Sequence, residues 1–224
     1  MNVNIFFYHN QSLYVVGRIL DDDNSEDSNY SGEENSYVMY KFCLKYSKWS
    51  KVQESGVKPT FYDHAYGTIF ENQLYIFYPE STETNKFREV FVFDFSTNVW
   101  NTKATKSKNQ DYPDERTRES YAFSRYCAYM SGGSTDHMGS FYSDVWRIDL
   151  ETLEWEKIDY FHETGVYDQL MSVVNDSYVY IVGGYDKNSH YLNTFERFAI
   201  RPPSLYRLCL ESQLHKVVTC CYSG

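Results

Sequence analysis

The chain has 224 residues, a formal net charge of −10 and an aromatic content of 19%. The negative charge disfavours sequence-independent binding to nucleic acid or to an acidic membrane, because both need a basic protein face. No apolar run of about 20 residues offers a membrane span, and the first residues lack the basic start of a secretory signal. The five cysteines have no regular spacing, which indicates reduced thiols and an intracellular protein. We expect it in the cytoplasm, with the nucleus as an alternative.

A sequence template recurs four times along the chain. Each copy has a tyrosine in a strand that leads to a glycine turn, and these tyrosines are Tyr14, Tyr75, Tyr129 and Tyr180. Apolar residues at alternate positions follow, which predicts half-buried β-strands. A tryptophan closes the first three copies, at Trp49, Trp100 and Trp155. A period near fifty residues with these offsets is typical of kelch repeats, so we predict an all-β, kelch-type β-propeller with about four recognisable blades.

The repeats divide the chain into expected units over residues 1–58, 59–110, 111–163 and 164–200, followed by a tail over 201–224. In the first unit, Arg18 replaces the second glycine of the turn, and the loop over 21–34 is strongly acidic. Such a charge run predicts a solvated, mobile excursion. A calcium site or a dock for a basic partner is the alternative, because consecutive aspartates offer hard oxygen ligands.

The tail changes its hydrophobic period. A pair of prolines at 202–203 stops the strand pattern. Leu205, Leu208 and Cys209 then recur at the spacing of one helix face. We therefore predict a short amphipathic C-terminal helix after the last blade.

The loop that enters the third unit carries two arginines. Kelch units typically have a Pro-x-x-Arg-x-x-His pattern in this loop; here Arg116 occupies the arginine position and Glu119 replaces the histidine, with Arg118 between them. These cations offer a binding site for an anionic group in an otherwise acidic protein. The alternative is that Arg116 is structural and pairs with Asp114, Glu115 or Glu119, because ion pairs with flanking acids are common.

Segment 13–17 with the long acidic loop after it, and segments 111–118 and 201–209, resemble the kelch domain-containing substrate receptors of cullin–RING ubiquitin ligases, of the "ten" type. The most specific feature is the order of a last blade followed by Pro-Ser-Leu and an amphipathic helix. The resemblance spans nearly the whole chain. It implies a propeller face that binds the C-terminal degron of a substrate protein through arginines and small hydroxyl residues. By position these are Arg116, Arg118 and Ser134. Arginine suits a free carboxylate because its planar fork donates two parallel hydrogen bonds.

In those receptors the helix after the last blade resembles an elongin-binding box. The resemblance implies that Leu205, Leu208 and Cys209 bind an elongin B/C adaptor and that cullin-2 joins through it. Gln213 stands where the box usually has an aliphatic residue, and the longer cullin-contacting segment of the receptors has no counterpart in these 224 residues. The family also has about six blades, so we expect an incomplete or open propeller.

We predict no catalytic residue, no metal site and no cofactor. The six histidines are scattered without ligand spacing, and neither a nucleophile elbow nor a phosphate-binding loop is present. Copper oxidases also use kelch propellers, but Cys127 falls in an expected strand and no second tyrosine with two histidines can be assigned as ligands. An enzyme is therefore not expected.

Three hypotheses about function remain. The first is a substrate-recognition subunit of a cullin–RING ligase. The second is a general kelch scaffold, cytoskeletal or signalling, in which the C-terminal helix packs against the last blade. These two differ in whether Leu205 and Cys209 are exposed or covered. The third is a truncated propeller that folds poorly because its edge strands are unpaired.

Overall fold

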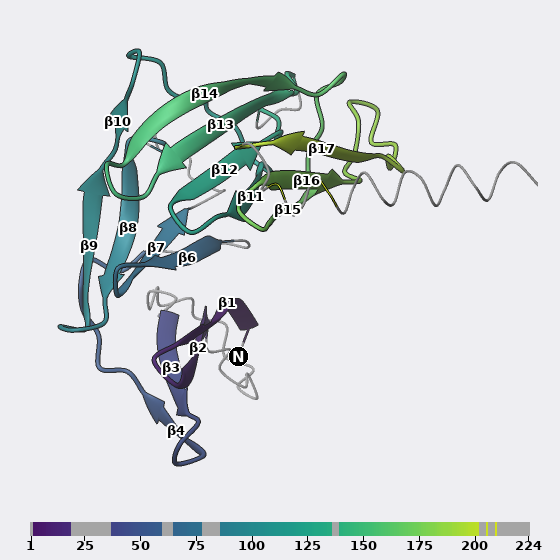
Figure 1. Ribbon diagram of the computed structural model, residues 1–224. Coiled ribbons are helices and arrows are strands. Elements are labelled where there is room, and N and C mark those ends of the chain that lie inside the picture. Colours follow the sequence, from purple (N-terminus) through teal and green to yellow (C-terminus); the bar gives the residue numbers. More distant parts are fainter. Residues whose placement is uncertain are drawn as a thin grey trace, which may run out of the picture.

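The computed structural model describes residues 2–18, 37–59, 65–77, 86–135 and 139–201, together with residues 205 and 209. Its strands form four sheets that follow one another along an arc (Figure 1). The predicted all-β, four-bladed kelch-type propeller is confirmed. The acidic loop over 21–34, most of the tail and Leu208 lie outside the described residues.

The first two sheets come from the N-terminal half of the chain. The first sheet has four antiparallel strands in sequence order: β1 (Asn2–His9), β2 (Ser12–Arg18), β3 (Tyr37–Cys43) and β4 (Lys48–Lys51). The second sheet contains β6 (Tyr66–Phe70), β7 (Gln73–Phe77), β8 (Glu89–Asp94) and β9 (Val99–Ala104). The short β5 (Ser55–Gly56) joins the outer edge of this sheet, parallel to β9. The segment that follows the first blade thus adds a short strand to the outer edge of the second blade.

The last two sheets repeat the plan and then shorten it. The third sheet contains β11 (Ser120–Phe123), β12 (Cys127–Ser131), β13 (Asp144–Asp149) and β14 (Glu154–Phe161), with β10 (Lys106–Ser107) added parallel to β14. The fourth sheet contains β15 (Leu170–Val174), β16 (Tyr178–Val182) and β17 (Phe195–Ala199). The template copy without a closing tryptophan is therefore the blade with three described strands.

Tight hairpins connect the inner strands of three blades. The turn pairs at 10–11, 71–72 and 175–176 all have positive φ at both residues. This backbone matches the right-handed twist of the flanking strands, and asparagine and aspartate tolerate it well. An asparagine or aspartate occurs in each pair, which explains why these strands reverse where they do.

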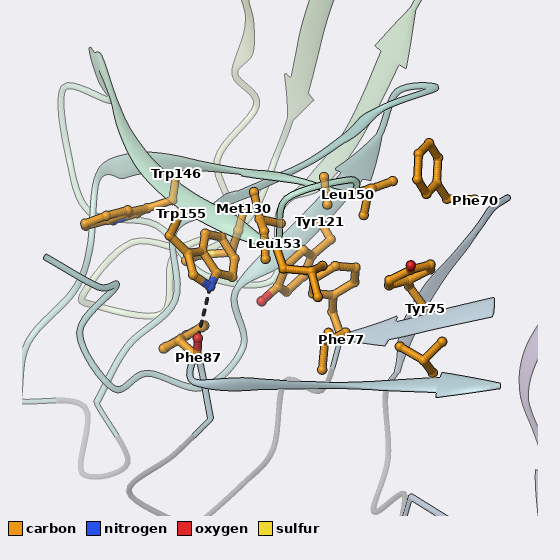
Figure 2. Close-up of a cluster of buried hydrophobic side chains, with 14 residues drawn as sticks. Phe70, Tyr75, Phe77, Phe87, Tyr121, Met130, Trp146, Leu150, Leu153 and Trp155 are labelled. Atoms are coloured by element: carbon orange, nitrogen blue, oxygen red, sulfur yellow. Dashed lines mark hydrogen bonds between the residues drawn. The ribbon is translucent and has the colours of Figure 1, made fainter. Parts of the chain in front are cut away.

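The core lies between the blades. Three clusters of buried apolar side chains fill the interfaces between the first and second, second and third, and third and fourth sheets. Figure 2 shows the middle cluster, in which the indole nitrogen of Trp155 donates a hydrogen bond to the Phe87 carbonyl at 3.0 Å. The Trp100 indole likewise donates to the Glu54 carboxylate at 2.6 Å. Trp100 and Trp155 therefore each pack against the preceding blade.

The described part of the tail agrees with a helix. Leu205 and Cys209 both have helical backbone and both are exposed. Within the described ranges, no helix has the length and apolarity to cross a membrane.

Candidate functional site

The loops of the third and fourth blades are held together by the glycine pair of the third blade. Gly132 and Gly133 both have positive φ, and a side chain on Gly133 would begin 2.8 Å from the Thr117 carbonyl oxygen. The Gly133 amide also donates to the Val166 carbonyl at 2.8 Å. Only glycine permits so close an approach of backbone in this conformation. The turn therefore fixes the loop that carries Arg116 against the loop that enters the fourth blade.

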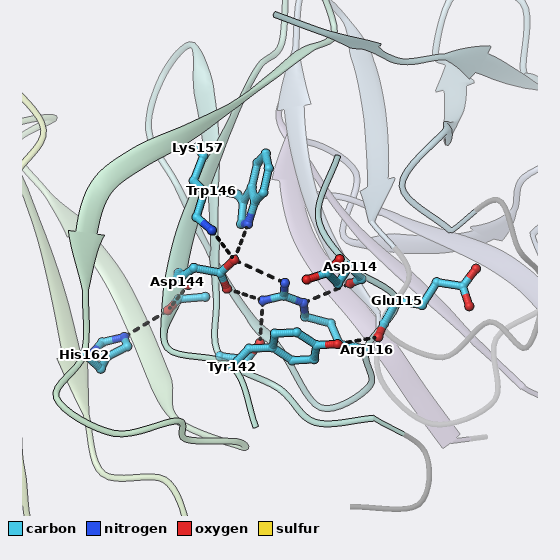
Figure 3. A network of polar contacts seen from close by, with 10 residues as sticks. Asp114, Glu115, Arg116, Tyr142, Asp144, Trp146, Lys157 and His162 are labelled. Atoms are coloured by element: carbon cyan, nitrogen blue, oxygen red, sulfur yellow. Dashed lines mark hydrogen bonds and ion pairs between the residues drawn. The ribbon is translucent and has the colours of Figure 1, made fainter. Parts of the chain in front are cut away.

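Arg116 lies at the centre of a polar network (Figure 3). Its side chain is fully buried, and Nη1 donates to Asp144 Oδ1 at 2.5 Å and to the Gly132 carbonyl at 3.3 Å. Nε donates to the Asp114 carbonyl at 3.0 Å, and the guanidinium stacks 3.7 Å from the centre of the Tyr142 ring. The donors of Arg116 are thus directed at groups of the protein itself.

Asp144 is the acidic partner of this network. Besides Arg116 it accepts a hydrogen bond from the Trp146 indole at 2.8 Å and lies 3.2 Å from Lys157 Nζ. Burial raises the pKa of the Asp144 carboxyl, but the hydrogen bonds and charge of Arg116 outweigh this and lower the pKa to about 2. The pair is therefore ionised over the whole physiological pH range.

A second buried ion pair lies next to the first. Glu119, at the histidine position of the kelch pattern, is 2.7 Å from Lys86 Nζ, and both side chains are almost fully buried. Burial raises the pKa of Glu119, while the Lys86 charge acts in the opposite direction. Lys86 comes from the second blade, so this pair joins the second and third blades. The adjacent Gln169 is also buried, and its amide has no hydrogen-bond partner among the described residues.

Arg118 is in a different environment from Arg116. Its side chain is 48% exposed, its Nη1 lies 3.7 Å from Asp168 Oδ2, and its guanidinium lies 5.4 Å from the centre of the Tyr167 ring. Exposed pairs at such a distance contribute little stability. The contact between Arg118 and Asp168 is therefore a weak one.

Ser134 lies close to both arginines in the fold but is covered. It forms β-bridges with Thr117 and Phe141, and it is almost completely buried. The structure thus brings the predicted residues Arg116, Arg118 and Ser134 to one region, but of the three only Arg118 faces solvent to any extent. The assignment of these residues to substrate binding stays a prediction.

A row of aromatic rings extends from Arg118 across the fourth blade. Tyr167 stacks on Tyr185 with ring centres 5.6 Å apart, and Tyr185 meets the exposed Tyr191 edge-on at 5.7 Å. Phe141 also contacts Tyr167, with the ring centres 5.8 Å apart. Tyr167 is buried, but Tyr185 and Tyr191 are exposed, and such rings offer apolar area at low entropic cost for recognition of a peptide.

A pocket of about 370 Å³ adjoins this row, and its lining residues are Phe141, Thr164, Gly165, Asp186 and Lys187. Gly165 is required there, because a side chain would begin 2.6 Å from Phe141. The sequence prediction missed the tyrosine row and Lys187. The available signal was the tyrosine directly after the second glycine pair, Tyr185, which occupies the same offset as Ser134.

Among the described residues, no group of three or more histidine, cysteine or acidic side chains is arranged to hold a metal ion. What the region presents is a shaped surface with one half-exposed arginine, a lysine and several aromatic rings. Repeated four-stranded blades that pack face to face through closing tryptophans define a kelch-type β-propeller, a class whose members are generally non-catalytic modules for protein interaction.

Comparison with known proteins agrees with this class. Residues 5–215 match the family model described as the KLHDC2/KLHL20/DRC7 Kelch-repeats domain, and the chain therefore belongs to the kelch-repeat family. It is similar to "Kelch domain-containing protein 10" of Xenopus tropicalis, with 30% identity over 135 residues, covering 57% of this chain and 31% of the relative. The Homo sapiens protein of the same name is 28% identical over 135 residues, covering 57% of this chain and 28% of the relative. The matched region thus spans about a third of the length of these relatives.

Among solved structures, the chain resembles the one titled "Structure of YjhT". The TM-score is 0.57 at 13% sequence identity, and the match covers 89% of this chain and 70% of the other. At this identity the likeness concerns the fold alone.

Proposed function

We propose that this kelch propeller is the substrate-recognition subunit of a cullin–RING ubiquitin ligase. In this role the loops of the third and fourth blades bind the C-terminal peptide of a substrate, and the segment after the last blade docks on an elongin B/C adaptor, through which cullin-2 is reached. The protein would act in the cytoplasm. Its matched relatives are kelch domain-containing proteins of the same type as the resemblance drawn from the sequence.

The observation that carries the proposal is the exposure of the apolar helix positions. Leu205 is 81% exposed, and Cys209, four residues later on helical backbone, is also exposed. Residues four apart on a helix lie on the same face. An amphipathic helix that docks in a partner's groove presents its apolar anchors in this way. A helix that packed on the fourth blade would cover Leu205.

Arg118 is the cation best placed to receive a substrate carboxylate. Arg116 already donates to Asp144, and removing it from that pair would leave a buried charge without its partner. Arg118 is half exposed and only loosely paired with Asp168. The tyrosine row beside it supplies apolar contacts for the residues that precede the substrate's C-terminus, and Lys187 adds a second positive charge at the pocket.

The general kelch scaffold is the second candidate. Both predicted arginines form ion pairs with carboxylates of the protein itself, which favours the scaffold. A dedicated receptor for a substrate carboxylate would offer more unpaired hydrogen-bond donors. In that case the tyrosine row binds an internal segment of a cytoskeletal or signalling partner.

The adaptor half of the proposal is tested by a pull-down with purified elongin B–elongin C. We expect the wild-type chain to be retained and the Leu205→Asp/Cys209→Asp double variant to be lost. Tyr126→Asp serves as the matched control, because Tyr126 is an exposed apolar residue on a turn of the third blade. All variants are first shown to be folded by circular dichroism. Absence of binding by a folded wild-type chain contradicts the ligase role.

The substrate half is tested with peptide pools that carry either a free or an amidated C-terminus. We expect preference for the free carboxylate, at least a tenfold weaker binding by Arg118→Ala, and partial retention by Arg118→Lys, because lysine keeps the charge but not the bidentate fork. Equal binding of free and amidated peptides would favour the scaffold instead.

A further inference from the structure

Arg118 and Asp168 occupy the same position of the kelch pattern in consecutive blades. Each directly precedes the residue at the histidine position, which is Glu119 in the third unit and Gln169 in the fourth. Both have positive φ, 60° and 54°, a backbone conformation that is uncommon for residues with a side chain. The Asp168 amide also donates a hydrogen bond to the Arg118 carbonyl at 3.1 Å. The backbone of two blades therefore sets an arginine and an aspartate side by side.

The side chains of Arg118 and Asp168 are both open to solvent, at 48% and 43% exposed. Their closest approach is 3.7 Å, which is longer than a hydrogen bond. The buried pair of Arg116 and Asp144, by contrast, is hydrogen-bonded at 2.5 Å. Arginine has five N–H donors, and a carboxylate can accept about four hydrogen bonds. The exposed pair therefore presents a donor group and an acceptor group next to each other, and a ligand can reach both.

The surface around Asp168 is rich in acids. The loops over 162–169 and 183–191 are joined by the β-bridges of Tyr185 with Tyr167 and Tyr191. Apart from two histidines, the charged residues of these loops are three acids and one lysine: Glu163, Asp168, Asp186 and Lys187. Burial raises the pKa of the Tyr66 phenol on the second blade, and the charges of Glu119 and Asp168 raise it further. This charge distribution favours a positively charged ligand group beside Asp168.

A carboxylate bound to Arg118 lies close to Asp168. Its oxygens would be about 2.8 Å from the guanidinium, and the Asp168 carboxylate is 3.7 Å from the same group. Two carboxylates so close to each other repel. A ligand that carries its own cation next to its carboxylate removes this repulsion, because the cation can pair with Asp168. A ligand with a second acidic group increases the repulsion.

We propose that Asp168 selects substrates that carry a lysine or an arginine in their last two residues. This inference rests on the proposed function, in which Arg118 binds the free C-terminal carboxylate. The carboxylate of the substrate takes the place of Asp168 at Arg118, and the basic side chain of the substrate pairs with Asp168. Charges of alternating sign then lie next to one another, and each carboxylate has a cation beside it.

Two exposed tyrosines supply contacts for such a basic side chain. Tyr185 is 38% and Tyr191 66% exposed, and their rings meet edge-on at 5.7 Å. Tyr185 stacks on Tyr167, whose ring centre is 5.4 Å from the Arg118 guanidinium. Aromatic faces attract ammonium and guanidinium groups, and the methylene stems of lysine and arginine pack well on apolar rings. The tyrosine row therefore favours a basic side chain over an acidic one.

The test measures the binding of labelled synthetic peptides to the whole chain by fluorescence anisotropy. The peptides share one glycine–serine upstream sequence and end in Lys-Ala, Ala-Lys, Ala-Ala or Glu-Ala, each with a free and with an amidated C-terminus. Among the free peptides, we expect the two with lysine to bind about threefold tighter than Ala-Ala, which is in the range that exposed ion pairs contribute. Glu-Ala should bind about threefold more weakly than Ala-Ala.

Substitutions of Asp168 test whether this residue causes the preference. Asp168→Asn removes the charge and tolerates the positive φ, so we expect the lysine, alanine and glutamate peptides to bind alike. Asp168→Lys should reverse the order and favour Glu-Ala. Circular dichroism shows whether each variant is folded, and Asp168→Asn decides the question by itself if Asp168→Lys is unfolded.

Asp176→Lys is the matched control. Asp176 is also an exposed acid beside an arginine, at 3.3 Å from Arg201, but it lies in the turn between β15 and β16, at the other end of β15 from Asp168. This variant should rank the peptides as the wild type does.

The ratio of the affinities for the lysine and glutamate peptides distinguishes selection from simple positioning. If Asp168 only oriented Arg118, Asp168→Asn would change the affinity for every peptide by the same factor. Equal binding of Lys-Ala and Glu-Ala by the wild type, or an unchanged ratio in Asp168→Asn, overturns the proposal; a preference for free over amidated peptides then leaves the proposed function standing. Equal binding of free and amidated peptides, or no binding of any peptide, overturns both.

Discussion

Trp155 and Trp49 occupy the same position in two copies of one sequence template, but one is buried and the other half exposed. Trp155 donates its indole hydrogen to the second blade and packs in the largest core cluster. Trp49 contacts Phe42 of its own blade with the two rings tilted by 50°, and it is half exposed. In a repeat protein each unit gains its stability at the interface with its neighbours. The comparison shows that the burial of a repeat residue depends on the neighbouring blade as much as on the residue itself.

The largest expected effect is on the buried tryptophan. Trp155→Ala removes a fully buried indole and leaves a cavity, so we expect the free energy of unfolding to fall by about 3 to 5 kcal/mol. Trp49→Ala removes a half-exposed ring and should cost about 1 kcal/mol or less in dilute solution. Urea denaturation of both variants measures the difference. Equal losses would mean that the two tryptophans are buried to the same extent in solution.

The two arginines allow the same comparison of a buried and an exposed residue for charged groups. Asp144→Asn leaves the buried Arg116 without its charged partner, and we expect a loss of about 3 kcal/mol in unfolding free energy. Asp168→Asn removes the exposed partner of Arg118 and should change stability by about 0.5 kcal/mol or less. Chemical denaturation compares the two variants. A small effect of Asp144→Asn would show that the guanidinium finds other acceptors or reaches solvent.

The glycine turn offers a comparison within a single blade. Gly133→Ala forces a side chain into a positive-φ position where its first carbon would lie 2.8 Å from a carbonyl oxygen, so we expect destabilisation of about 1 to 3 kcal/mol. Gly139→Ala, in the same loop, meets no atom of the described residues closer than 3.6 Å and has no positive φ, and it should be nearly neutral. Thermal unfolding followed by circular dichroism separates the two. If both substitutions were neutral, the loop would not be held by the turn.

The last comparison concerns the pH dependence of stability. The pKa of Asp144 is lowered to about 2 in the folded protein, whereas an unfolded aspartate has a pKa of about 3.9. The folded state therefore binds this proton less readily than the unfolded state. The stabilisation that the ionised Asp144 carboxylate provides is complete above about pH 4 and is lost as the pH falls toward 2. Denaturation midpoints measured from pH 5 to pH 2 should fall less steeply for Asp144→Asn than for the wild type. Parallel curves would contradict the assigned shift.

Much of the site could not be predicted, because the residues that contact one another there are far apart in the sequence. Arg116 was recognised from its kelch position, and nearby acids were its expected partners. The structure pairs it with Asp144, which lies 28 residues away on the far side of the diglycine loop. The tyrosine row is assembled from two loops, one before β15 and one between β16 and β17, so no local pattern indicates that Tyr167 lies beside Tyr185 and Tyr191.

The sequence by itself determined the class of fold, the number of recognisable blades and the strand positions, because side-chain alternation, glycine turns and closing tryptophans are local features that repeat. It also indicated the helical segment with Leu205 and Cys209. Only the tertiary structure decided which copies of a repeated residue are buried, which arginine is buried in its ion pair and which faces of the array are left open. Those properties depend on contacts between blades. A sequence template that is the same in each blade cannot predict which blades have a neighbour.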